Sequence, residues 1–125
     1  MKRKRIFISG VQKELAEERA ALRDYLHADP LLRRFFEVFL FEDLPASDRR
    51  AEEVYLDEVA DCDLYLGLFA NEYGWENAKG RSPTECEFNA ATAQNKPRQI
   101  YVKGANDKTK HPKMQALIRR AGSMT

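Results

Sequence analysis

The feature that most constrains the fold is an alternation of short apolar runs with longer segments of helical composition. The apolar runs are rich in β-branched and aromatic side chains and end at small or turn-forming residues, as buried strands do; they cover residues 5–10, 35–41, 64–69 and 98–102. The helical segments run from Val11 to the helix-ending Pro30 and over residues 49–60, 82–95 and 112–120. This β-α order predicts an α/β fold, a flavodoxin-like three-layer sandwich in which helices cover both faces of a parallel sheet of four to five strands.

Length and charge limit the number of domains and the kinds of partner. At 125 residues the chain can build one continuous core, so we expect a single domain over residues 1–125. Lys and Arg total 21 against 20 Asp and Glu, and the net charge of +1 gives little attraction for nucleic acid or an anionic membrane. The basic run at residues 2–5 could touch DNA phosphate, but a solvated terminus is the simpler interpretation.

Cysteine usage and hydropathy point to a cytoplasmic protein without a metal site. Cys62 and Cys86 form no CxxC motif and have no nearby histidine cluster, which indicates neither a disulfide framework nor zinc. No apolar run approaches the roughly 20 residues of a membrane span, and the basic first residues are not followed by the apolar stretch of a signal peptide. Glycine-rich phosphate loops are also absent, so no bound cofactor is expected.

In an open parallel sheet, ligands bind beyond the carboxyl ends of the strands. This rule selects four loops, at residues 9–12, 42–48, 71–80 and 104–110. Ser9, Gly10 and Val11 could offer a hydroxyl and backbone N–H groups to a ribose or phosphate, although a tight strand-to-helix turn needs the same residues. The loops and the helix start that follows them supply the ligand-binding candidates Ser9, Gly10, Val11, Glu42, Tyr73, Gly74 and Ser82.

The segment 82–87 has the signals of a helix start. Ser82 as N-cap, Pro83 at the first helical position and Glu85 two residues later match the capping box, which explains Glu85 structurally. Glu87 lies outside the box. It is either a solvated helix carboxylate, which is the simpler interpretation, or a group that binds ribose hydroxyls or stabilises a positively charged sugar carbon when an N-glycosidic bond breaks.

Two aromatic side chains, Tyr73 and Trp75, flank Gly74 in the third loop. They could stack on a base or nicotinamide, but aromatic residues at the end of a buried strand more often pack into the core or its rim. We therefore expect packing for both.

Several segments in order resemble a bacterial family, domain of unknown function 4062. They lie at residues 6–15, 62–69, 73–74 and 82–88, and the similarity extends over nearly the whole chain. The pattern is more distantly similar to TIR domains and nucleoside 2-deoxyribosyltransferases, which place a catalytic glutamate on the helix after the third strand. This resemblance implies Glu87 as the catalytic residue, with Glu85 as the alternative, and NAD or a nucleoside as substrate.

The resemblance leaves two classes of function open. One is a TIR-like nucleotide-recognition domain of a bacterial regulatory or defence protein, an NAD glycohydrolase or deoxyribosyltransferase-like enzyme if it is catalytic. The other is a non-catalytic module that self-associates through loop 44–48 or the neighbouring helices. Such a module stands at the N-terminus of a longer protein such as a transcriptional regulator. Direct DNA binding is disfavoured by the near-zero net charge.

Overall fold

The four apolar runs form one parallel sheet with the strand order β2-β1-β3-β4. The computed structural model describes residues 2–40, 42 and 51–123. The strands are β1 (Lys4–Ser9), β2 (Phe36–Phe39), β3 (Leu64–Phe69) and β4 (Arg98–Val102). The predicted parallel α/β fold is therefore confirmed.

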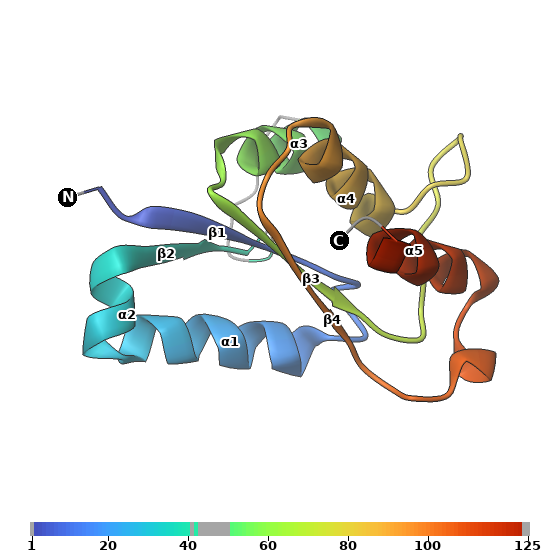
Figure 1. Ribbon diagram of the computed structural model, residues 1–125, viewed down its shortest axis with the longest axis horizontal. Helices are drawn as coiled ribbons and strands as arrows, with labels where there is room; N and C mark the ends of the chain where they lie inside the picture. Colours follow the sequence, from blue (N-terminus) through green and yellow to red (C-terminus); the bar gives the residue numbers. More distant parts are fainter. Residues whose placement is uncertain (1, 41, 43–50, 124–125) are drawn as a thin grey trace.

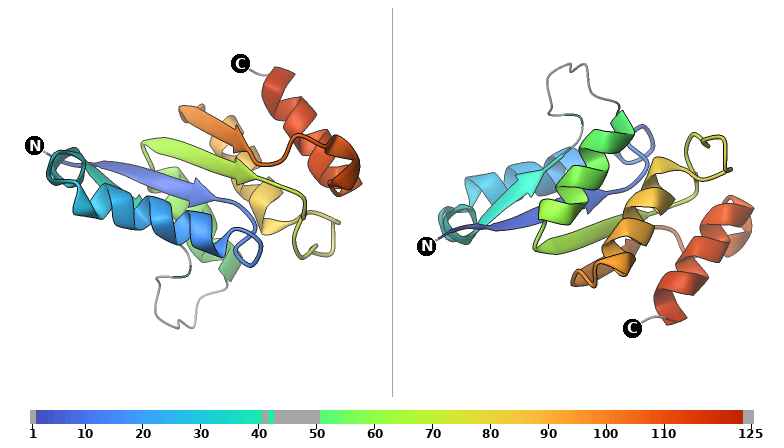
Figure 2. Two further views of the ribbon diagram at one scale, coloured as in Figure 1. Left: turned by 90° about the horizontal axis from the view of Figure 1, so that it is seen from below. Right: turned by 90° about the horizontal axis from the view of Figure 1, so that it is seen from above.

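Helices cover both faces of this sheet, as the β-α order predicts. One face carries α1 (Ala16–Ala28) and the short α2 (Pro30–Phe35), and the other carries α3 (Ala51–Asp61) and α4 (Pro83–Ala93) (Figures 1 and 2). The last helix, α5 (Pro112–Ser123), packs beside α4. Of the helices in the described ranges, none combines the length and the apolar character that crossing a membrane requires.

Two local details differ from the sequence-based expectation. The first helix begins at Ala16 rather than at Val11, because residues 12–15 form a turn in which the Leu15 N–H donates to the Val11 carbonyl at 2.9 Å. Pro30 does more than end that helix, since it also begins α2. The Asp29 carboxylate accepts the first free N–H groups of α2, and Pro30 has the fixed φ that suits a first helical position.

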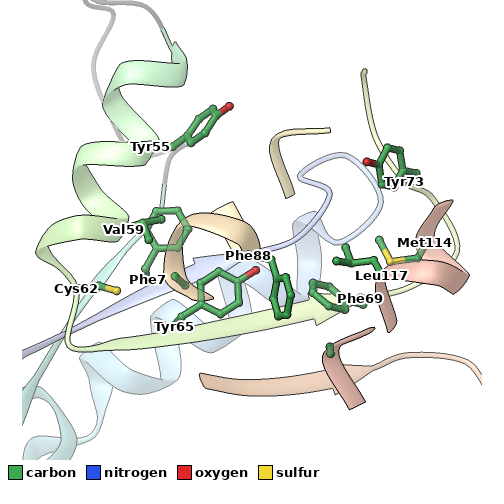
Figure 3. Close-up of a cluster of buried hydrophobic side chains, with 12 residues drawn as sticks. Phe7, Tyr55, Val59, Cys62, Tyr65, Phe69, Tyr73, Phe88, Met114 and Leu117 are labelled. Atoms are coloured by element: carbon green, nitrogen blue, oxygen red, sulfur yellow. The ribbon is translucent and has the colours of Figure 1, made fainter. Parts of the chain in front are cut away.

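Side-chain alternation along β1 divides the core and positions the site. Ile6 and Ile8 face α1 and pack in one apolar cluster, whereas Phe7 packs in the opposite cluster with Tyr65, Phe69 and Phe88. Figure 3 shows Tyr65, Phe88 and Phe69 side by side in this second cluster. Because strand side chains repeat every second residue, Ser9 shares the face of Phe7 and is directed toward α4.

Candidate functional site

The strand order places a topological switch point between β1 and β3. From β1 the chain crosses to β2 on one side, and from β3 it crosses to β4 on the other, so the connections diverge beyond the carboxyl ends of these two strands. Open α/β sheets bind ligands at such a point. The loops that leave β1 and β3 enclose the candidate site.

Glu87 lies at this point and is buried rather than solvated. The buried positions of α4 are Thr84, Glu87, Phe88 and Ala91, a helical stripe that faces the sheet. Glu87 belongs to that stripe and is only 7% exposed. The simpler interpretation of Glu87 as a solvated helix carboxylate is therefore wrong.

Ser9 from β1 meets Glu87 from α4 inside the fold. The Ser9 hydroxyl donates a hydrogen bond to Glu87 Oε1 at 2.6 Å. Burial raises the pKa of the Glu87 carboxyl to about 7, although the Ser9 hydrogen bond and the charge of Arg19 act in the opposite direction. A carboxyl group with this pKa populates both its charged and its neutral form near neutral pH.

Glu87 opens onto a pocket of about 260 Å³. Gly10 and Val11 from the loop after β1 line it together with Gly74 from the loop after β3, as the sequence predicts. Gly10 has φ +151°, and a Cβ at this position would lie 2.7 Å from the Leu68 carbonyl oxygen. Glycine is thus required there to bring the loop against β3 beside the pocket.

Arg19 also lines this pocket, which the sequence did not predict. Arg19 lies on α1 and, although its side chain is charged, is only 2% exposed. The guanidinium donates to both carboxylate oxygens of Glu42, at 2.7 and 2.8 Å, and to the Gly10 carbonyl at 3.0 Å. No local pattern marks Arg19 for burial, because its partner is 23 residues away in the sequence.

Glu42 takes part in the site through Arg19 rather than by lining the pocket. Partial burial raises the pKa of Glu42, but the hydrogen bonds and charge of Arg19 outweigh burial and hold this pKa below its ordinary value. Glu42 is therefore a partner that fixes Arg19 and, through it, the loop after β1. The expected contact loop at residues 44–48 lies outside the described residues.

Glu85, Tyr73 and Ser82 do not line the Glu87 pocket. Ser82 caps α4 as predicted, since its hydroxyl accepts the Glu85 N–H at 3.2 Å. The reciprocal half of the capping box is not formed. The Tyr73 hydroxyl instead accepts the Ser82 N–H at 3.2 Å and donates to Glu85 Oε1 at 2.7 Å.

The Glu85 carboxylate faces a separate cavity of about 430 Å³ between α4 and α5. In this cavity Arg120 Nη1 lies 3.6 Å from Glu85 Oε2. The two carboxylates of the helix start thus point into different cavities. Only Glu87 shares a pocket with the loop after β1.

Tyr73 packs in the core as expected, but Trp75 does not. Tyr73 is 2% exposed and stacks on His111, with ring centroids 5.4 Å apart. Trp75 is 77% exposed and lines the Glu87 pocket. The expectation that Trp75 packs into the protein is therefore wrong.

The Tyr65 hydroxyl is a further polar group near Glu87. The sequence did not indicate it, because Tyr65 lies inside a buried strand. The hydroxyl of Tyr65 is fully buried and has no hydrogen-bond partner among the described residues. Burial and the neighbouring Glu87 carboxylate raise the pKa of Tyr65 well above its ordinary value. Within residues 2–40, 42 and 51–123, no three His, Cys, Asp or Glu side chains come together as a possible metal-binding group.

The fold and the position of the site define a parallel α/β domain with a candidate ligand pocket at the switch point of its sheet. The chain belongs to the family described as a domain of unknown function (DUF4062), whose sequence pattern matches residues 5–123. A solved structure with a similar fold is that of the CMP N-glycosidase BcmB from Clostridium botulinum, with a TM-score of 0.56 and 18% identity over 96% of this chain and 81% of that chain. No curated protein gives a significant match.

Proposed function

We propose that this domain binds a nucleotide-type ligand beyond the carboxyl ends of β1 and β3 and cleaves its N-glycosidic bond with Glu87. The observation that carries the proposal is a buried carboxyl group, with a pKa of about 7, that lines a pocket at the switch point. The fold shared with a CMP N-glycosidase supports the same class of reaction.

Glu87 suits this chemistry because its two oxygens differ. Ser9 holds Oε1, whereas Oε2 has no hydrogen-bond partner in the part of the chain that the structure describes. Ionised Glu87 can stabilise the positive charge that develops on the sugar C1′, or form a bond to it, while the electron pair of the N-glycosidic bond leaves with the base. Water then supplies a hydroxyl group to C1′. Its remaining proton passes to the departing base when the N-glycoside is uncharged, as in CMP, and to solvent when the base is cationic in the substrate, as in NAD.

The direct test is release of free base from NAD, CMP and nucleosides by the purified protein and its Glu87→Gln variant. We expect the variant to lose at least about 100-fold in rate, because the amide cannot supply the negative charge that C1′ requires. Glu85→Gln is the matched control. It removes a carboxylate of the same helix but keeps an oxygen that accepts the Tyr73 hydroxyl, and it should retain activity.

Base release by Glu87→Gln at the wild-type rate would overturn the proposal, and loss of activity in Glu85→Gln alone would transfer the catalytic role to Glu85. Comparing the wild-type chain with Glu87→Gln inside cells tests whether the domain acts in regulation or defence. Expression of the wild-type chain, but not of Glu87→Gln, should then deplete NAD or nucleotide pools.

Self-association is a second candidate function, favoured by one observation. β4 is the last strand in the described sheet order, and its Tyr101 and Val102 are 57% and 45% exposed. An edge strand with exposed apolar side chains can pair with a second copy of the chain. In this alternative the domain assembles a longer protein and leaves effector work to another region.

A further inference from the structure

The Glu87 pocket adjoins a larger cavity. The second cavity measures about 680 Å³ and shares Val11, Gly74 and Trp75 with the 260 Å³ pocket around Glu87. Sites for small-molecule ligands typically measure about 300–1,000 Å³, so the Glu87 pocket alone is small for a nucleotide. A ligand of that size would extend past Trp75 into the second cavity.

Trp75 stands at the boundary of the two cavities with its side chain in solvent. In the described residues it makes no recorded hydrogen bond or ring contact. An indole that is 77% exposed contributes little to the core, since apolar burial is what makes tryptophan stabilising. Its position beside a buried carboxylate therefore indicates a role other than core packing.

The backbone that carries Trp75 is fixed on both sides. Before it, the Glu14 carboxylate accepts the N–H groups of Asn71 and Glu72, each at 3.0 Å. After it, the Asn77 side chain accepts two N–H groups of its own turn, and Glu76 pairs with Lys113 of α5. An exposed aromatic ring on an anchored loop is a preorganised stacking surface.

We propose that Trp75 is the stacking platform for the aromatic base of the ligand whose sugar lies at Glu87, and that this ligand occupies both cavities. The proposal rests on the function proposed above and specifies its substrate as an N-glycoside with a flat aromatic base. Base–aromatic stacking accepts different bases, so Trp75 would contribute affinity for the base without selecting a particular one.

The test uses the fact that Trp75 is the only tryptophan of the chain. Its fluorescence in the Glu87→Gln variant, which prevents turnover, is followed while CMP, cytidine or NAD is added, and binding of the same ligands is measured by calorimetry. We expect a saturable fluorescence change for the ligand that binds. On the Glu87→Gln background, Trp75→Ala should weaken calorimetric binding about 5- to 150-fold, and Trp75→Phe should retain most of the affinity.

Tyr25→Ala is the control for removing an exposed aromatic side chain. Tyr25 lies on α1 and is 62% exposed, so this substitution should leave ligand binding unchanged. If calorimetry detects a ligand whose binding neither changes the fluorescence nor weakens in Trp75→Ala, the stacking role is wrong while the proposed function stands. If none of these ligands binds or is turned over by the wild-type protein, the proposed function fails and the stacking role fails with it.

Discussion

Glu87 is a carboxyl group that folding removes almost completely from water, and it receives only one hydrogen bond from a described side chain. Ionising such a group is costly, which is why its pKa rises from 4.5 to about 7. The folded state therefore binds the Glu87 proton more tightly than the unfolded state does. A residue that weakens the fold at physiological pH is typical of a functional position.

The pH dependence of stability follows from this shift. The contribution of protonated Glu87 is fully present below pH 4.5 and is lost as the pH rises through about 7, which corresponds to a change of about 3 kcal/mol at most. Because Gln cannot ionise, the free energy of unfolding of Glu87→Gln minus that of the wild type should increase between pH 4.5 and pH 8. Urea unfolding of both proteins across this range measures the difference.

Taking the difference between the two proteins removes the contributions of titrating groups that do not interact with Glu87; Glu42, whose charge raises the Glu87 pKa, stays coupled to it. Parallel pH curves for the wild type and Glu87→Gln would show that the Glu87 pKa is not raised in the folded state. That result would contradict the burial of Glu87 beneath the pocket.

At the level of secondary structure, most of the elements are local properties of the sequence and were predictable. The strands follow from apolar runs, and the start of α4 follows from Ser82 and Pro83. The burial of Glu87 could also have been predicted from the sequence, since Thr84, Glu87, Phe88 and Ala91 have the spacing of one helix face. The burial of Arg19 and, among the described residues, the unpaired hydroxyl of Tyr65 could not have been predicted, because contacts between distant segments create their environments.

The exposed edge strand β4 provides a test of the self-association candidate. If the domain self-associates through this edge, light scattering over a concentration series should show dimers, and Val102→Lys should weaken them because a charge on an edge strand opposes pairing. Leu31→Lys adds the same charge at another exposed apolar position, on α2, and should leave the dimer intact. A strict monomer at every concentration would exclude this module.

For the whole molecule, the strand pattern predicted where a site should lie, and the family resemblance favoured Glu87 over Glu85 as the residue that faces it. The rule for open α/β sheets selected the loops after β1 and β3, and Ser9, Gly10, Val11 and Gly74 lie beside or near Glu87 as expected. The helix start places Glu85 and Glu87 only two residues apart, yet α4 turns them into different cavities. The helix-face spacing turns Glu87 toward the sheet, but the cavity that Glu85 faces depends on the packing of α5 beside α4, which local patterns do not encode.

The most direct test of the central claim is the pH dependence of base release, expressed as kcat/KM, for whichever of NAD, CMP or a nucleoside the wild-type protein cleaves. This parameter reports the pKa of the essential group in the free enzyme. Because ionised Glu87 is the reactive form, we predict a rate that rises as the pH increases through about 7 and then levels off, and that is lost in Glu87→Gln. A rate that falls through the same range, or one that Glu87→Gln leaves unchanged, would contradict the account.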